Sequence, residues 1–249
     1  IADQETIHLT TGSFDARPSE RIGEDYDAFK YHFRPGLPNY LDLADALSTW
    51  VIDNSNAYEW ERIGIQTPNL EEITPFFERL RENISGHLAV PYADQKADLG
   101  DYRPQLEEVA DAGCDVLLTG HPFGGQMLVS QWAAGEYPFA LGGLQSQAMS
   151  PTSWKDTEGD IESVFTLDGF TPTSDNTGRT RAFVADYQNR YGRSPAYAGG
   201  LTYDALRIYQ AAVEDVVRSD DSALPNDERL IDALEAFTFS VGVVYPEFE

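Results

Sequence analysis

One turn carries the residues with the clearest chemical potential, Gly120-His121-Pro122-Phe123-Gly124-Gly125. It follows the apolar run 116–118 and precedes a helical pattern, which is where α/β hydrolases place a nucleophilic serine. The serine position here is Pro122, which has no nucleophilic oxygen and whose ring fixes φ at about −65°. A hydrolase is therefore the least favoured alternative, and we predict that the turn recognises a ligand through His121 and Phe123.

The remaining reactive side chains do not form a catalytic or metal-binding set. The four histidines, at positions 8, 32, 87 and 121, are far apart in the sequence and have no cysteine partner. Adjacent acids such as Glu71 and Glu72 fall on polar helix starts, where a solvated surface is the expected role. Cys114 precedes the apolar run and is expected to be a small buried residue. We therefore predict that the protein is not an enzyme and holds no metal and no cofactor.

The charge of the chain restricts its partners. It has 42 acidic and 17 basic residues, for a net charge of −25, and only three of the basic residues are lysines. Neutralising phosphates requires clustered lysine and arginine, so nucleic acid is excluded as a partner. The acids are spread along the whole chain, which argues against a disordered acidic tail. A dispersed acidic surface poor in lysine is typical of proteins from halophilic, archaeon-like organisms, and an ordinary acidic protein is the alternative.

Apolar runs of strand length alternate with helical patterns in the middle of the chain, which predicts an α/β fold. The helical patterns carry apolar residues at helical spacing, among which we expect Trp50 and Met127 to face the core. Strands separated by helices demand right-handed crossovers, so we predict a parallel sheet with helices on both faces. The expected strands lie at five places: 60–66, 87–90, 115–119, 139–143 and 161–167.

The flanking segments differ from this central part. Residues 5–13 and 29–33 predict short strands, with a polar loop around 23–26 between them. Amphipathic patterns after residue 170 predict three helices. A further strand is expected to begin within 240–244.

Loops at the expected strand ends combine polar and aromatic residues, which suits the binding of a small molecule without chemical change. In parallel sheets, ligands bind outside the carboxyl ends of the strands. The first loop, Thr10-Thr11-Gly12-Ser13, offers hydroxyls and backbone amides to a carboxylate or an amide, and a plain turn is the alternative. The other loops are 68–70, 121–123 and 143–147.

Several segments resemble the branched-chain-amino-acid-type substrate-binding proteins of ABC transporters. Residues 62–65 (RIGI), 101–106 (DYRPQL) and 113–118 (GCDVLL) are similar to the second lobe of these proteins. Residues 183–195 (FVADYQNRYGRSP), followed by 203–205 (YDA), are similar to their most recognisable segment. The order of the segments agrees with the family along nearly the whole chain.

The resemblance implies an α/β fold of the class I periplasmic-binding-protein type, with two lobes of which the first is incomplete. The chain is therefore expected to be a fragment. Hinge strands are implied near 33–38 and 168–171. The implied organisation assigns 1–36 to trailing strands of lobe 1, 37–169 to lobe 2, 170–237 to returning helices of lobe 1 and 238–249 to the start of a crossing back toward lobe 2.

The resemblance also implies a set of ligand-binding residues. Asn69 falls in a turn where the family carries a tyrosine, which is missing here. Leu144 or Gln145 falls near the acid that binds the ammonium of an amino acid, and neither is acidic. Because a buried ammonium without a counter-charge is costly, an amide, a neutral solute and an aromatic acid are as open as an amino acid. The implied residues are Thr10, Thr11, Gly12, Ser13, Asn69, His121, Phe123, Leu144 and Gln145.

The resemblance implies an extracellular solute receptor that delivers a small polar solute to an ABC transporter permease by hinge closure. The solute is expected to be an amino acid, an amide or a related compound. The receptor is expected to be a monomer at the outer face of the cell membrane, with a lipid anchor on an N-terminal segment missing from this chain. A ligand-sensing domain of a regulator or receptor with the same fold is the alternative.

The acidic composition predicts stability that depends on salt. We expect the midpoint of thermal unfolding to be higher in about 1 M KCl than in about 0.1 M KCl, because a Debye length of about 3 Å screens the repulsion among the acids. Scanning fluorimetry over a KCl series at constant pH measures this, with sucrose as the control for general exclusion effects. A midpoint that stays constant or falls would contradict the halophilic interpretation.

Overall fold

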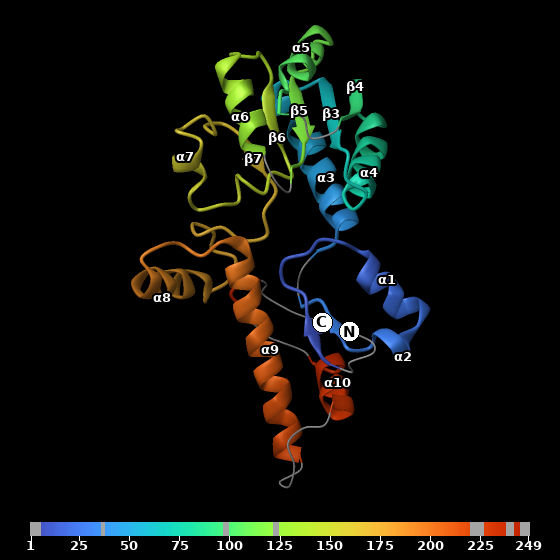
Figure 1. Ribbon diagram of the computed structural model, residues 1–249, viewed down its shortest axis with the longest axis vertical. Coiled ribbons are helices and arrows are strands. Elements are labelled where there is room, and N and C mark those ends of the chain that lie inside the picture. The colour runs from blue at the N-terminus through green and yellow to red at the C-terminus, as the bar shows by residue number, and fades with distance from the viewer. Residues whose placement is uncertain are drawn as a thin grey trace. The chain divides into compact units, whose positions relative to one another are not determined.

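The chain folds into two compact units in this computed structural model (Figure 1). Unit 1 comprises Ile1–Asn39 and Gly169–Glu249, and unit 2 comprises Tyr40–Asp168. The chain therefore passes from one unit to the other twice. The structure describes residues 6–35, 38–96, 100–121, 125–219, 227–237 and 242–244.

Unit 2 is built on a five-stranded sheet whose paired strands are all parallel. The order across the sheet is β4-β3-β5-β6-β7, so the chain begins near the centre of the sheet and adds strands on both sides. The predicted parallel sheet is therefore confirmed. The strands are β3 (Arg62–Pro68), β4 (Ala89–Lys96), β5 (Val116–Thr119), β6 (Ala140–Gly143) and β7 (Phe165–Thr166).

Helices cover both faces of this sheet, as the sequence predicted (Figure 1). Leu117 and Leu141 lie side by side in the register and pack in one cluster with α5 (Arg103–Asp111) and α6 (Gly125–Ala134). Ile65 is offset by one residue from that face and lines the opposite side, together with Phe77 of α4. The helices on this opposite side are α3 (Tyr40–Tyr58) and α4 (Thr74–Ser85), which pack on each other.

Two side chains predicted to face the core of unit 2 are instead exposed. Trp50 is 37% exposed and Met127 is 47% exposed. Trp50 precedes the fully buried Val51 on α3, so it lies at the edge of the buried face of this helix. Its ring packs against Trp60 and Phe165, with ring centroids 6.1 and 5.3 Å apart. An apolar residue at the edge of a buried helix face is therefore easily predicted to be buried, although the structure leaves it partly exposed.

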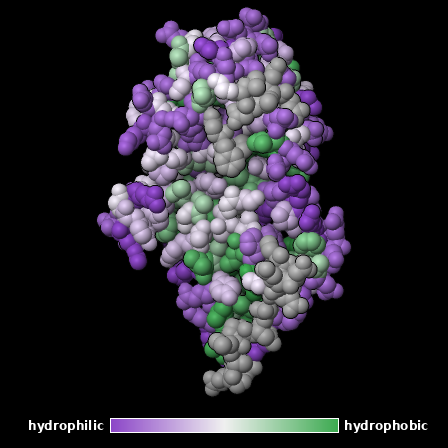
Figure 2. Space-filling view, viewed as in Figure 1, coloured by the Kyte–Doolittle hydropathy of each residue, from purple (hydrophilic) through white to green (hydrophobic). Residues whose placement is uncertain are grey.

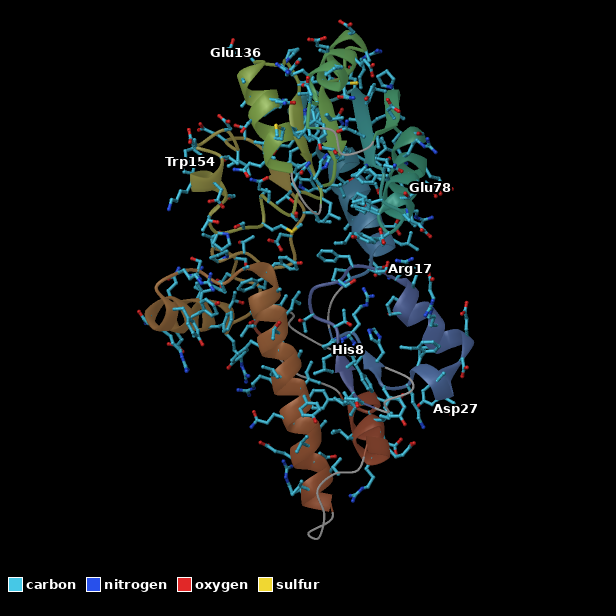
Figure 3. All side chains as sticks on the ribbon, in the orientation of Figure 1. His8, Arg17, Asp27, Glu78, Glu136 and Trp154 are labelled. Atoms are coloured by element: carbon cyan, nitrogen blue, oxygen red, sulfur yellow. The ribbon has the colours of Figure 1, made fainter. Side chains whose placement is uncertain are left out.

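The last part of unit 2 is less regular than expected. The strand predicted for 161–167 is limited to Phe165–Thr166, although Ile161 is buried among turns. A short helix, α7 (Ser153–Asp156), lies where no helix was expected. Its Trp154 is 58% exposed, and Figure 3 shows this side chain at the periphery of unit 2.

An acid and an arginine anchor the start of the central strand β3. The carboxylate of Asp115 accepts hydrogen bonds from the backbone N–H groups of Glu61 and Arg62, each at 2.8 Å. The guanidinium of Arg62 donates to the carbonyl oxygens of Gly113 and Ala112 at 2.9 and 2.6 Å. These contacts tie β3 to the turn that connects α5 with β5, so Asp115 has a structural role.

Cys114 is buried, as the sequence predicted. It packs against Gly64 of β3, where an added β-carbon would lie 3.3 Å from the sulfur. Burial raises the pKa of the Cys114 thiol to about 11, so the thiol is protonated at neutral pH. A protonated, buried thiol is a poor nucleophile.

The beginning of unit 1 contains helices where a polar loop was expected. The strands β1 (His8–Leu9) and β2 (His32–Phe33) pair in parallel. Between them along the chain lie α1 (Arg17–Glu24) and α2 (Tyr26–Phe29), so the prediction of a polar loop around 23–26 is wrong. Pro18 lies in the first turn of α1, where backbone N–H groups have no acceptor within the helix, so the missing N–H of proline costs no hydrogen bond. Asp25 is the N-cap of α2, and its side chain accepts a hydrogen bond from the backbone N–H of Ala28 at 3.2 Å.

The three helices predicted after residue 170 are present in unit 1. Gly192 ends α8 with a positive φ of 67°, which glycine adopts without strain. Leu230 and Leu234 of α10 pack against Ile208 and Ala212 of α9, and Phe33 of β2 packs against the same cluster. The helices are α8 (Thr180–Tyr191), α9 (Tyr197–Ser219) and α10 (Asp227–Glu235).

Residues 242–244 are held in unit 1 by side chains and not by a sheet. The carboxylate of Asp204 on α9 accepts hydrogen bonds from the backbone N–H groups of Val243 at 2.9 Å and Val244 at 3.0 Å. The hydroxyls of Thr177 and Thr180 donate to the carbonyl oxygens of Gly242 and Val243, each at 2.7 Å. The strand expected within 240–244 is absent from 242–244, and positions 240 and 241 lie outside the described residues.

Charged and polar residues are frequent on the surface, in keeping with the charge of the sequence. Hydrophilic residues predominate among the coloured residues of the face in Figure 2, and hydrophobic residues are visible between them. In the portion of the chain that the structure describes, no helix combines the length and the apolar character needed to cross a bilayer.

Asp204 provides a test of how unit 1 holds residues 242–244. Burial raises the pKa of the Asp204 carboxyl, although the two backbone donors act in the opposite direction. Asp204→Ala leaves those buried N–H groups without an acceptor, so we expect the free energy of unfolding to fall by about 2 kcal/mol. Asp204→Asn keeps an acceptor and avoids a buried charge, so we expect a smaller loss.

Urea denaturation followed by circular dichroism measures both variants. All four tryptophans lie in unit 2, so tryptophan fluorescence reports that unit separately. Asp215→Ala, an exposed change on the same helix, is the matched control. Equal stability of Asp204→Ala and Asp215→Ala would contradict the anchoring role.

Candidate functional site

The carboxyl ends of the three central strands of unit 2 bring together a group of buried polar side chains. Gln66 lies near the end of β3 and Thr119 at the end of β5, and these two residues are paired in the register. His121 follows β5 and Gln145 follows β6. We call Gln66, Thr119, His121 and Gln145 the carboxyl-end cluster, and each is at most 3% exposed.

Glycines allow the ends of β5 and β6 to approach closely. Gly143 has a φ of +126°, and an added β-carbon would lie 2.1 Å from the carbonyl oxygen of Thr119. A β-carbon at Gly120 would lie 3.0 Å from the carbonyl oxygen of Leu144. The backbone N–H of Leu144 donates to the carbonyl of Thr119 at 2.9 Å. Only glycine fits at Gly143, because a side chain there meets backbone and requires a strained conformation.

The N-terminus of α6 faces the same cluster. A β-carbon at Gly125, the first residue of α6, would lie 3.3 Å from Oε1 of Gln145 and 3.1 Å from Cβ of His121. The first N–H groups of a helix have no partner within the helix, and the macrodipole makes this end positive. The cluster therefore lies beside a set of backbone donors with a positive electrostatic potential.

Gln145 is the residue of the cluster whose hydrogen-bonding capacity is unused. The side chain is 1% exposed, and neither Nε2 nor Oε1 has a hydrogen-bond partner among the described residues. Its backbone N–H is engaged, since it donates to the Thr166 hydroxyl at 3.0 Å. Buried amide groups are nearly always hydrogen-bonded, so this side chain is a candidate for ligand binding.

The strand predicted before His121 and the helix predicted after it are present, as β5 and α6. The ring of His121 is buried edge-on to Tyr102, with centroids 5.4 Å apart, and its carbonyl accepts a hydrogen bond from the Ser146 hydroxyl at 2.7 Å. Pro122 and Phe123 lie outside the described residues. The structure therefore brings His121 and Gln145 together but does not describe Phe123.

The other two candidates in unit 2 are placed differently. Leu144 is buried at 5% exposure, next to Gly120. Asn69 lies in the bend after β3, and its side chain is exposed.

The loop of residues 10–13 lies in unit 1, directly after β1. The Thr10 hydroxyl lies 2.7 Å from Nε2 of the buried His32, and burial, followed by the nearby charges of His8 and Arg34, lowers the pKa of His32. Neutral His32 therefore positions Thr10 at neutral pH. His8, labelled in Figure 3, lies beside it in β1 with ring centroids 5.4 Å apart.

The remaining loop residues are tied to the same unit. The hydroxyls of Thr11 and Thr202 are 2.9 Å apart, and the Tyr197 hydroxyl donates to the carbonyl of Gly12 at 3.2 Å. Arg34 donates to the carbonyl of Ser13 at 3.1 Å. These hydrogen bonds hold the loop in one conformation and leave Gly12 exposed, so the loop can offer its backbone to a ligand.

Two hollows are lined by residues other than the predicted ones. One, of about 290 Å³, lies between α4 and the sheet and is lined by Thr67, Arg81 and Glu78, which Figure 3 labels. The other, of about 890 Å³, lies between α8 and α9 and includes Thr202. Aromatic and arginine side chains dominate its lining: Phe183, Tyr187, Tyr191, Tyr203, Arg179, Arg190 and Arg207.

Gln66, Thr119 and Gly125 were missed as members of the site by reasoning from the sequence. Gln66 and Thr119 are polar residues near the ends of otherwise apolar strands, and that signal was available. Their proximity depends on the order of the strands in the sheet, which could not be predicted from the sequence. Among the residues described, no three histidine, cysteine or acidic side chains are arranged to hold a metal ion.

The comparisons with known proteins concern both the sequence and the fold. The family model described as periplasmic binding protein matches residues 6–247. No curated protein sequence matches the chain.

Solved structures share the fold at low sequence identity. A leucine-binding protein from Thermotoga maritima has a TM-score of 0.75 and 16% identity, with 98% of this chain and 66% of that chain covered. A solute-binding protein of an ABC transporter from R. palustris, in complex with benzoate, has a TM-score of 0.78 and 14% identity, with coverage of 100% and 64%.

A third structure extends this agreement. A branched-chain amino acid transporter substrate-binding protein from Streptococcus pneumoniae, in complex with isoleucine, has a TM-score of 0.74 and 13% identity, with coverage of 98% and 65%. The chain thus spans 64–66% of the length of these three proteins. The α/β fold implied by the sequence resemblance is confirmed.

The close approach at Gly143 leads to a prediction about the stability of the site. For Gly143→Ala we expect the free energy of unfolding of unit 2 to fall by about 2 kcal/mol or more, because the β-carbon meets the Thr119 carbonyl and φ is positive. Urea denaturation followed by tryptophan fluorescence measures this. Gly100→Ala, in the same unit and with no atom within 4 Å of the added carbon, is the control. Similar midpoints for the two variants would contradict the packing described.

Proposed function

The chain belongs to the periplasmic binding protein family, and we propose that it is the solute-binding part of an ABC transporter receptor. It binds a small polar solute and delivers it to a membrane permease, with hinge motion between open and closed states. It carries out no chemical step on the solute.

The observation that carries this proposal is the unused amide of Gln145 in the carboxyl-end cluster. The cluster lies at the carboxyl ends of parallel strands, where α/β proteins bind ligands. A buried side chain with an unpaired donor and an unpaired acceptor lowers the stability of the folded protein unless a ligand or water supplies the missing hydrogen bonds. Binding of a polar solute supplies them.

Each unit contributes its own candidate contacts. In unit 2 we propose that His121 and Gln145 bind the solute, with Asn69 and Phe123 as further contacts and Leu144 shaping the floor. In unit 1 we propose Thr10, Thr11, Gly12 and Ser13. Support for this loop comes from the hydrogen bonds that hold Thr10 and Thr11 in position and leave Gly12 exposed.

Membership of the family supports a proposal about the partners and the location. The related structures named above bind leucine, isoleucine and benzoate, and two of these proteins carry the name of a transporter. We propose that this protein likewise works with a permease at the outer face of the membrane, as a monomer with a lipid anchor. Its net charge of −25 suits a surrounding medium rich in salt.

A solute screen tests the proposed function. We expect at least one compound among amino acids, amides, small neutral solutes and aromatic acids to raise the unfolding midpoint of the protein in about 1 M KCl, because binding to the folded state alone stabilises it. Scanning fluorimetry makes the measurement, and calorimetry confirms each positive compound at one site per chain. Hydrolysis of generic esters is assayed in parallel. Failure of every solute to bind, or turnover of an ester, would overturn the proposal.

A further inference from the structure

We propose that the solute presents a neutral amide-type group, with an N–H next to a C=O, to Gln145, and that the site discriminates against ammonium groups. This inference rests on the proposed function and specifies its solute class. It follows from the chemistry at the carboxyl ends of β3, β5 and β6.

The first step concerns what Gln145 offers. Its amide carries two N–H donors on Nε2 and an acceptor at Oε1, and both atoms are buried without a partner in the described part of the chain. A 180° rotation of the amide exchanges the two atoms, so the conclusion does not depend on their assignment. A solute group with an acceptor and a donor side by side satisfies both atoms with two parallel hydrogen bonds. Carboxamides, lactams and ureas have this arrangement.

The second step concerns the charge around Gln145. The N-terminus of α6 lies next to Oε1, and this end of a helix disfavours a cation. The strand ends 66–69, 119–121 and 143–147 contain no acidic residue. The acids of the two outer strands are Asp94 in β4 and Asp168 after β7, and both already interact with other groups of the protein. An ammonium at Gln145 would therefore find no counter-charge at the described strand ends of unit 2.

The third step separates an amide from a carboxylate. A carboxylate suits the α6 donors and Nε2, but it has no hydrogen to give to Oε1. A bound carboxylate would therefore leave Oε1 without a donor. An amide satisfies Nε2 and Oε1 together and carries no net charge to desolvate. The neutral amide is therefore the best match.

Matched probes test the proposal directly. We use isobutyramide, isobutyrate and valine as one series and benzamide, benzoate and phenylalanine as another, and we measure affinity by calorimetry on the whole chain in about 1 M KCl. We expect an amide of at least one series to bind about tenfold or more tightly than its acid and its amino acid. Tighter binding of the acid or the amino acid in both series, or binding of neither amide, overturns the proposal.

Variants of Gln145 assign the effect to this side chain. Gln145→Glu removes the donors and adds a negative charge, so we expect amide affinity to fall about tenfold or more and binding of the matching amino acid to improve. Gln145→Met keeps length without polar donors, so we expect amide binding to fall without any gain for the amino acid. Gln188→Glu, an exposed change of the same type on α8 in unit 1, is the control and is expected to bind as the parent does.

These outcomes separate the two proposals. If other solutes from the screen bind but neither amide does, the solute class is wrong and the receptor function stands. If amides bind equally well to the parent and to Gln145→Met, the role of Gln145 is wrong. If no solute binds at all, both proposals fail. Circular dichroism verifies that each variant is folded before its affinity is compared with that of the parent.

Discussion

The close approach of β5 and β6 at their carboxyl ends is the constraint on which the site depends. Gly143 permits it, because any side chain at this position would overlap the Thr119 carbonyl. The approach brings the residues after both strands together, so His121 and Gln145 meet beside the first turn of α6. The glycines of these turns therefore act as packing residues, and the polar side chains that follow them provide the chemistry.

Two buried polar side chains show how structural and functional roles differ in this fold. The Asp204 carboxylate accepts backbone hydrogen bonds from Val243 and Val244, so its burial is compensated within unit 1. The Gln145 amide has no such compensation among the described residues. Satisfied burial stabilises one conformation, whereas unsatisfied burial leaves binding free energy for a solute. The second case therefore marks the candidate site.

Much of the architecture could be predicted from the sequence. The alternating apolar runs predicted the parallel sheet, and the stop at Gly192 follows from glycine chemistry. The helices around Asp25 could not be read from apolar periodicity, because α1 and α2 bury no residue completely. Trp50 misled because an aromatic ring at a helix border is apolar but only partly covered. Periodicity thus identified the deeply buried elements and failed at the surface.

The sequence by itself determined the residue types at the strand ends, the absence of acids from them, the missing nucleophile at Pro122 and the charge of the surface. These are properties of composition and of local order, so no fold is needed to state them. Only the tertiary structure decided that Gln66, Thr119, His121 and Gln145 share one cluster, and that the Gln145 amide is unpaired. The reason is physical: strand order and burial arise from contacts between segments far apart in the chain, and hydrogen-bond satisfaction depends on those contacts.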